Sequence, residues 1–227
     1  MCSFYSLHNT YNNEKNKYFK IWKDNYLVYF IFGLFWFYCK EYNINYSNLN
    51  KYNKGNGMQK VGLFFGSDTG NTEEISKIIQ DKIGSDIVDV KDIANSTKED
   101  FENYDLFLFG IPTWYYGENQ CDWDDFFPEL ETIDFNGKKV GIFGCGDQED
   151  YAEYFCDAMG AIAEILTNNG ASLIGKTSSE GYEFEESKAL LEDNQLVGLC
   201  IDEDRQPEMT EERVLNWVKQ IKTEMNL

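Results

Sequence analysis

The chain has 227 residues, with 40 Asp and Glu against 20 Lys and Arg and a formal net charge of −20. Residues 1–57 hold seven of the basic and three of the acidic side chains, which leaves 13 basic and 37 acidic ones and a formal charge of −24 for residues 58–227. A charge of this size repels nucleic acid, which we exclude as a partner, and anionic membrane surfaces, which makes a membrane an unfavourable partner for this region; it favours basic protein surfaces.

Residues 1–57 differ from the rest in composition, since Asn, Tyr, Lys, Phe and Ile make up 36 of them. Their one apolar stretch, residues 26–39, is shorter than the roughly 20 residues that span a bilayer as a helix. No small-residue cleavage site of a signal peptide follows it. The bias is also typical of translated AT-rich non-coding DNA. We predict that residues 1–57 are disordered or not part of the natural protein, with Met58 as its start; the alternative is a membrane-associated leader.

The next predicted elements are a strand over 60–66 and a helix over 71–83, joined by a hydroxyl-rich loop. The loop has the sequence Ser67-Asp68-Thr69-Gly70-Asn71-Thr72. Free backbone N–H groups and the positive end of the helix dipole favour an anion here, and the hydroxyls can donate further hydrogen bonds. We therefore predict a phosphate site without Lys or Arg; the alternative is a simple helix cap.

Two further loops each follow a predicted buried strand. The strand over 104–110 leads into Ile111-Pro112-Thr113-Trp114-Tyr115-Tyr116-Gly117, and the strand over 139–144 leads into Gly144-Cys145-Gly146-Asp147-Gln148-Glu149-Asp150-Tyr151. In an open parallel sheet such loops emerge at one edge, where ligands bind. Each aromatic side chain could be a simple packing group. Together the three loops predict one ligand held by a phosphate cradle and aromatic rings.

The remaining pattern completes an alternation of strands and helices in one domain over 58–227, which is long enough for one sizeable core. Further strands are predicted over 86–90 and over 171–175, the latter continuing near 196–201, and further helices over 98–102, 122–131, 152–168 and 210–224. The last helix should bury Val214, Trp217, Val218 and Ile221. This alternation predicts an α/β fold with a five-stranded parallel sheet flanked by helices.

Cysteine and histidine usage excludes several chemistries. The domain contains Cys121, Cys145, Cys156 and Cys200 without a C-x-x-C pair, so the sequence indicates neither a zinc site nor a redox dithiol. These residues are expected to be thiols in a reducing cytosol. The one histidine, His8, precedes the domain, so Ser-His-Asp and Cys-His arrangements cannot form within it.

The three loops, in their order and spacing, resemble the FMN loops of long-chain flavodoxins, and the resemblance runs from about Met58 to the C-terminus. Residues 181–188 and 197–207 are similar to the long-chain subgroup, whose last strand is split by an inserted loop. Residues 114–116 and 120–123 are most similar to the enteric-bacterial type. The resemblance implies a flavodoxin-like three-layer sandwich with sheet order 2-1-3-4-5, helices on both faces and FMN as cofactor.

The resemblance also implies which residues hold FMN. The phosphate would lie on the 67–72 loop, and Trp114 and Tyr151 would sandwich the isoalloxazine ring. The complete expected set is Ser67, Asp68, Thr69, Gly70, Asn71, Thr72, Pro112, Thr113, Trp114, Tyr115, Tyr116, Gly117, Cys145, Gly146, Asp147, Gln148 and Tyr151.

The implied function is that of a low-potential one-electron carrier that shuttles mainly between semiquinone and hydroquinone. Stacked aromatic rings and nearby carboxylates disfavour the anionic hydroquinone, which makes the second reduction potential strongly negative. A peptide flip in the 114–117 loop would bond the reduced flavin N5–H. Here the chain departs from relatives that have glycine at the flipping position, because Tyr115 and Tyr116 make a positive φ more costly.

Two alternatives remain open. The first is an FMN-dependent NAD(P)H quinone reductase on the same fold, although aromatic residues cover both flavin faces and no basic group is available for a nicotinamide phosphate. The second is a phospho-acceptor signalling domain, which needs an acceptor Asp where this chain has Ile111-Pro112-Thr113. We expect a cytoplasmic monomer that is not itself an enzyme. Its implied partners are an NADPH-dependent flavodoxin/ferredoxin reductase and acceptors such as radical or cobalamin-dependent enzymes.

Overall fold

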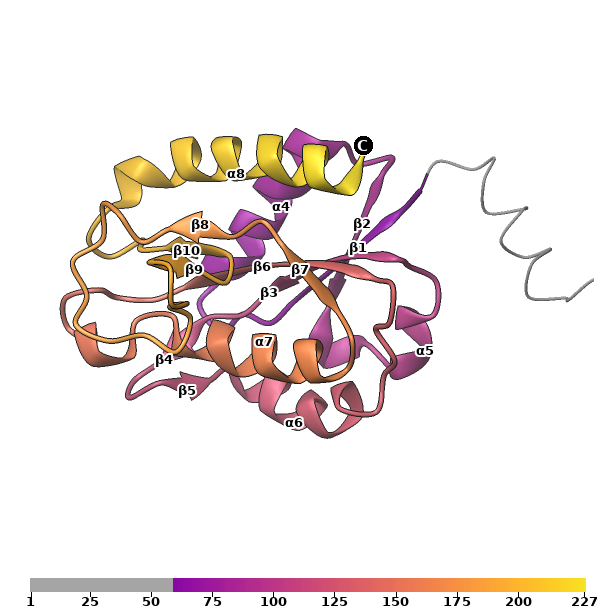
Figure 1. Ribbon diagram of the computed structural model, residues 1–227, viewed down its shortest axis with the longest axis horizontal. Coiled ribbons are helices and arrows are strands. Elements are labelled where there is room, and N and C mark those ends of the chain that lie inside the picture. Colours follow the sequence, from indigo (N-terminus) through magenta and orange to yellow (C-terminus); the bar gives the residue numbers. More distant parts are fainter. Residues whose placement is uncertain (1–58) are drawn as a thin grey trace, which may run out of the picture. The chain divides into compact units, whose positions relative to one another are not determined.

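A computed structural model describes residues 59–227, and the predictions for residues 1–57 lie outside this part. Its central sheet is parallel (Figure 1). The first four positions are β2 (Val88–Asp92), β1 (Val61–Phe65), β3 (Leu106–Gly110) and β6 (Lys139–Cys145). The predicted α/β class and the order 2-1-3-4-5 are confirmed. Strand β2 begins two residues later than predicted, because Gly84 first closes a turn by accepting the N–H groups of Ile87 and Val88.

The fifth position of the sheet is shared by two short strands. The first half of β6 pairs with β7 (Ser172–Ile174) and its second half pairs with β10 (Leu199–Ile201). The chain leaves the sheet between them and returns after a two-stranded antiparallel ladder, β8 (Thr177–Ser178) with β9 (Gln195–Leu196). The insertion predicted to split the last strand therefore lies between β7 and β10.

Helices cover both faces of the sheet (Figure 1). Helices α4 (Asn71–Ile83) and α8 (Thr210–Met225) lie on one face, and α5 (Lys98–Phe101), α6 (Cys121–Leu130) and α7 (Asp157–Asn168) lie on the other. Short 3₁₀ turns occupy Ile93–Asn95, Ala152–Tyr154 and Pro207–Met209. Among residues 59–227, no helix is both long and apolar enough to span a membrane.

Two apolar clusters hold these layers together, one on each face. Alternate residues of a strand point to opposite sides, so Phe64 packs toward α5 while its neighbour Leu63 packs toward α4 and α8. The rings of Phe64 and Phe101 stack with centroids 4.0 Å apart. The predicted apolar face of the last helix is confirmed, since Val214, Trp217, Val218 and Ile221 are all buried.

The helix predicted over 152–168 is wrong at its start. Residues 152–154 form a separate 3₁₀ turn, and α7 begins only at Asp157, because Cys156 adopts a left-handed conformation (φ 56°) that interrupts the helix. The chain also forms a second two-stranded antiparallel ladder that the sequence did not predict, β4 (Thr113–Trp114) with β5 (Glu118–Asn119). Strands of two residues are too short to show a period.

Candidate functional site

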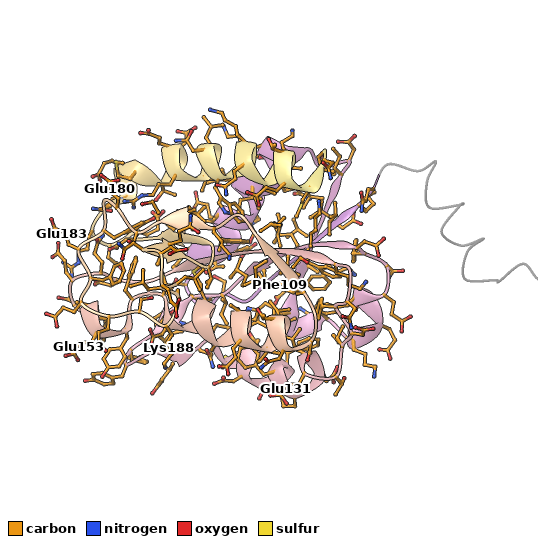
Figure 2. The ribbon with its side chains drawn as sticks, viewed as in Figure 1. Phe109, Glu131, Glu153, Glu180, Glu183 and Lys188 are labelled. Carbon is orange, nitrogen blue, oxygen red and sulfur yellow. The ribbon has the colours of Figure 1, made fainter. Side chains whose placement is uncertain are left out.

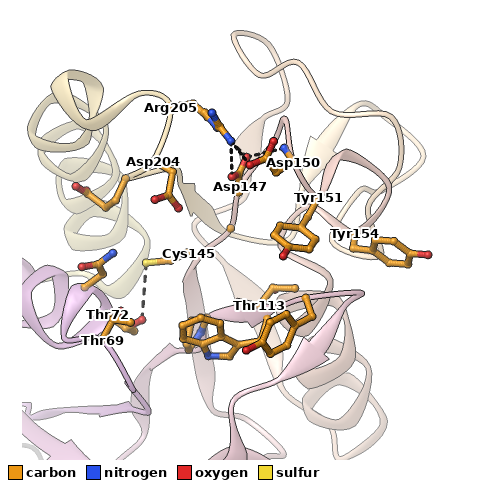
Figure 3. A pocket seen from close by; sticks show the side chains of 16 residues that line it. Thr69, Thr72, Thr113, Cys145, Asp147, Asp150, Tyr151, Tyr154, Asp204 and Arg205 are labelled. Carbon is orange, nitrogen blue, oxygen red and sulfur yellow. Dashed lines mark hydrogen bonds and ion pairs between the residues drawn. The ribbon is translucent and has the colours of Figure 1, made fainter.

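A ligand-sized cavity of about 500 Å³ lies at the carboxyl ends of the strands (Figure 3). The loops that follow β1, β3, β6 and β10 all contribute to it, as expected for parallel strands. Its walls combine short polar side chains, aromatic rings and carboxylates. The lining residues are Thr69, Asn71, Thr72, Pro112, Thr113, Trp114, Tyr115, Cys145, Gly146, Asp147, Asp150, Tyr151, Tyr154, Glu203, Asp204 and Arg205.

One wall is the N-terminal end of α4. Gly70 precedes the helix with φ 96°, and no side chain caps the helix end. The first helical hydrogen bond runs from the N–H of Glu74 to the carbonyl of Gly70 (2.9 Å), so the N–H groups of residues 71–73 have no acceptor within the helix. The Ser67 hydroxyl accepts from the N–H of Gly70 (3.1 Å) and shapes the loop. Such an end can bind an anion without a cationic side chain.

A second wall is aromatic and comes from the loop after β3. Trp114 is half-buried, and its buried Nε1 has no hydrogen-bond partner, which leaves an unused donor on a residue that lines the cavity. Tyr115 has φ 42°, so this loop holds a tyrosine in the left-handed region that favours glycine. The Thr113 hydroxyl accepts from the N–H of Ala158 (3.0 Å) and fixes the loop to the start of α7.

The loop after β6 carries the second aromatic residue, Tyr151. Tyr116 forms T-shaped ring contacts with Tyr151 (centroids 6.3 Å apart, interplanar angle 80°) and with Tyr154 (5.8 Å, 84°). Gln148 in the same loop is buried and turned away from the cavity. Its backbone N–H and Nε2 both donate to Asp202 Oδ2 (3.1 and 2.8 Å), and its Oε1 accepts from the N–H of Glu183 (2.7 Å).

Cys145 is the thiol that lines the cavity. Burial raises the pKa of Cys145 to about 12, although the Thr72 hydroxyl, 3.7 Å from Sγ, acts in the opposite direction. The side chain is therefore a neutral thiol at physiological pH and offers no thiolate for nucleophilic attack.

Outside the cavity, Asp68, Cys121 and Asp122 bring their side chains close together. The Gln120 amide already donates to Asp68 Oδ1 (3.1 Å) and to Asp122 Oδ2 (2.6 Å). Desolvation and the charges of Asp122 and Asp68 raise the pKa of the Cys121 thiol. The amide and the neutral thiol account for this cluster without a metal ion.

The predicted site residues fall into two groups. Most line the cavity: Thr69, Asn71, Thr72, Pro112, Thr113, Trp114, Tyr115, Cys145, Gly146, Asp147 and Tyr151. The others, which are not among the lining residues, are Ser67, Asp68, Gly70, Tyr116, Gly117 and Gln148. Ser67 and Gly70 form the turn before α4, Asp68 bonds Gln120, and Gln148 anchors its loop. Tyr116 is 72% exposed.

Five lining residues are not in the expected FMN-binding set: Asp150, Tyr154, Glu203, Asp204 and Arg205. Tyr154 follows Tyr151 by one turn and could have been included on that ground. Residues 203–205 follow β10, and the rule that loops meet at the carboxyl edge applies to the fifth strand as well. Applied to the fifth strand, that rule would have predicted residues 203–205 as part of the site.

Comparisons with known proteins agree with this architecture. The chain matches the family model for flavodoxin over residues 63–217. Flavodoxin of Haemophilus influenzae is 66% identical over 170 residues, which cover 75% of this chain and 98% of that protein. Flavodoxin 1 of Escherichia coli strain K12 is 65% identical over 170 residues, which cover 75% of this chain and 97% of that protein. The resemblance to the enteric-bacterial type is confirmed.

Solved structures show the same fold. Fusobacterium nucleatum flavodoxin bound to flavin mononucleotide superimposes with a TM-score of 0.70 at 33% identity, covering 74% of this chain and 99% of that one. From its motifs, its sheet order and these matches, the chain belongs to the flavodoxin family.

Proposed function

We propose that the cavity binds FMN non-covalently and that the protein carries single electrons between redox enzymes. The observation that carries this proposal is the meeting of an uncharged N–H cradle with aromatic walls in one cavity. Its volume of about 500 Å³ lies within the roughly 300–1,000 Å³ range of small-molecule sites. A phosphate and a planar ring are the two ends of FMN, and one wall of the cavity suits each.

Different residues of the chain bind different parts of the cofactor. The N–H groups of residues 71–73 and the hydroxyls of Thr69 and Thr72 receive the phosphate, and the helix dipole offsets its charge. Trp114 and Tyr151 lie against the ring and keep water from it. When bound, FMN supplies the one-electron redox chemistry. The chain supplies the site and its charge, and it does not need a catalytic group of its own.

Partners follow from the charge of residues 58–227. We propose a basic, NADPH-dependent flavodoxin/ferredoxin reductase as the electron donor and radical or cobalamin-dependent enzymes as acceptors, in the cytoplasm. A formal charge of −24 attracts basic surfaces and raises association rates.

Purification of the full chain tests the proposal. We expect a yellow protein with one FMN per chain, which accepts electrons one at a time, oxidises no NADPH alone and is reduced when a flavodoxin reductase and NADPH are added. A colourless protein that cannot be reconstituted with FMN would contradict the cofactor. Steady NADPH consumption with a quinone, without a reductase, would instead identify a quinone reductase.

We also propose residues 58–227 as the complete FMN-binding domain. The curated relatives align over 170 residues that cover almost their whole length. A protein truncated to begin at Met58 is therefore expected to bind FMN with the affinity of the full chain and to unfold at the same temperature. Isothermal titration and thermal unfolding measure both quantities. Loss of folding or of FMN binding on truncation would show that residues 1–57 belong to the domain.

A further inference from the structure

Arg205 joins the two loops that form the acidic side of the cavity (Figure 3). Its guanidinium binds Asp147 through two hydrogen bonds, from Nε to Oδ1 (3.1 Å) and from Nη2 to Oδ2 (3.0 Å). The same side chain contacts Asp150 Oδ2 (2.5 Å) and Glu149 Oε2 (3.7 Å). A paired, planar contact of this kind fixes direction as well as distance, which a lysine cannot do.

The carboxylate that Arg205 holds organises the loop after β6. Asp147 Oδ1 also accepts from the N–H groups of Glu149 and Asp150, each at 2.9 Å, and so closes the turn that leads to Tyr151. Burial raises the pKa of Asp147, but the hydrogen bonds from Arg205 and from these two N–H groups outweigh burial, so its pKa lies below the usual range. Asp147 is therefore a carboxylate at neutral pH.

The backbone at Arg205 is tied to the same loop. Asp202 Oδ1 accepts from the N–H groups of Asp204 (3.1 Å) and Arg205 (2.9 Å), while Asp202 Oδ2 accepts from Gln148. The Asp202 carboxylate thus fixes both the backbone of Arg205 and Gln148 in the loop after β6. The Arg205 side chain then binds that loop a second time, through Asp147.

Charge gives Arg205 a second role. The cavity lining contains the carboxylates of Asp147, Asp150, Glu203 and Asp204, and Arg205 is the one cation among the described lining residues. A reduced, anionic cofactor in this cavity is repelled by those carboxylates, and Arg205 offsets part of that repulsion.

We propose that Arg205 is a positioning residue that holds the 147–151 loop, and with it Tyr151, in the shape that binds FMN, and that its charge favours the reduced cofactor. This inference rests on the proposed FMN function. Its two parts, geometry and charge, can be separated, because lysine keeps the charge and loses the paired contact, whereas glutamine loses both.

The test compares Arg205→Gln, Arg205→Lys and the matched control Arg213→Gln. Arg213 is the other arginine of the described residues, and it binds Gly181, Gln206 and the Tyr182 ring instead of the 147–151 loop. Dissociation constants are measured for oxidised FMN by fluorescence quenching and for fully reduced FMN under anaerobic conditions. Hydrogen exchange of the Glu149 and Asp150 amides is measured in the FMN-free proteins.

For Arg205→Gln we expect oxidised FMN to bind about 5- to 20-fold more weakly, at the low end of the effect of a lost charge-assisted contact, because Arg205 acts on FMN through the loop. Reduced FMN should lose a further factor of about 3 to 10 from the lost charge. Arg205→Lys should weaken oxidised FMN but keep the wild-type ratio of the two constants. In both Arg205 variants the Glu149 and Asp150 amides should exchange faster. Arg213→Gln should change neither the ratio nor the exchange.

Unchanged exchange and unchanged affinity in Arg205→Gln would overturn the positioning role, and an unchanged ratio would overturn the charge role. Equal losses in Arg213→Gln would also overturn the proposal. Should Arg205→Gln fail to fold, Arg205→Lys decides the geometric part, and Asp147→Asn, which removes the same paired contact, is measured beside it. If the unaltered chain does not bind FMN, the proposed function fails, while exchange still decides whether Arg205 holds the loop.

Discussion

Electron transfer from a basic reductase to this protein is expected to slow about tenfold or more when ionic strength rises from about 0.01 to about 0.15 M, because the Debye length shortens from about 30 to about 8 Å. The physical reason is the formal charge of −24 on residues 58–227. Stopped-flow mixing with the reductase in excess measures the second-order rate constant. A rate constant independent of salt would contradict electrostatic docking.

The carboxylates that carry this effect can be chosen from the structure. The acidic residues expected beside the cofactor are Glu118, Asp122, Asp124, Asp125, Asp147, Glu149 and Asp150. Several of them already bind groups of the protein itself. Asp122 accepts a hydrogen bond from Gln120 and Asp124 accepts one from Asn119. Asp147, Glu149 and Asp150 form ion pairs with Arg205. Glu118, Asp125 and Glu153 are exposed, and the first two belong to β5 and α6, which follow Trp114 in the chain.

Neutralising Glu118, Asp125 and Glu153 together should therefore lower the association rate at low salt while leaving FMN affinity nearly unchanged. The matched control neutralises Glu99, Glu102 and Glu131, which are also exposed and belong to segments that supply no residue to the cavity lining. Figure 2 shows Glu153 and Glu131 on separate parts of the surface. Both variants lose the same net charge, so a larger effect of the first locates docking beside the cavity. Equal effects would indicate that only the total charge matters.

The second large effect is expected at Tyr151. Tyr151→Ala should weaken oxidised FMN by about 1–3 kcal/mol, or roughly 5- to 150-fold, the range for losing a stacked ring and its buried area. Because a stacked ring favours the oxidised cofactor over the electron-rich reduced one, the reduced state should lose less, and the second reduction potential should rise. Isothermal titration and anaerobic redox titration measure the two quantities.

Tyr116→Ala is the matched comparison for Tyr151→Ala. Tyr116 is 72% exposed and meets Tyr151 only in a T-shaped contact, so its removal should weaken FMN binding much less. An unchanged dissociation constant and unchanged potentials in Tyr151→Ala would remove Tyr151 from the site. A larger loss in Tyr116→Ala would show that FMN binding closes the loop around Tyr116.

The fold could be predicted from sequence because its central strands β1 and β3 are continuous apolar runs and its long helices show a regular apolar face. The apolar runs 61–66 and 104–110 are typical of strands that are buried on both faces in the middle of a sheet. Ile75, Ile79 and Ile83 recur at helical spacing. The start of α7 could not be predicted, because the break depends on a single left-handed residue, Cys156, in a stretch whose apolar pattern is continuous.

The candidate site was predictable where local sequence determines it. The 67–72 loop forms an anion-binding site through its own backbone. Trp114 and Tyr151 were predictable because they lie in the segments that follow β3 and β6 at the carboxyl edge of the sheet. Gln148 and Arg205 depend on distant partners instead. Gln148 turns inward because Asp202 offers it a buried acceptor, and Arg205 reaches the cavity because β10 ends beside β6. No local pattern in either segment carries that information.

The division of the fifth sheet position between β7 and β10 also bears on how the protein stays apart from other copies of itself. A long, regular edge strand offers a row of free N–H and C=O groups to which another chain can add. Here that border consists of two pieces of three residues each, from different parts of the chain, with the 175–198 excursion between them. The opposite border, β2, carries the charged residues Asp89 and Lys91, and charged side chains on an edge strand disfavour pairing with another chain. Both borders are thus poor templates for β-aggregation, even though the strands inside the sheet are among the most apolar of the domain.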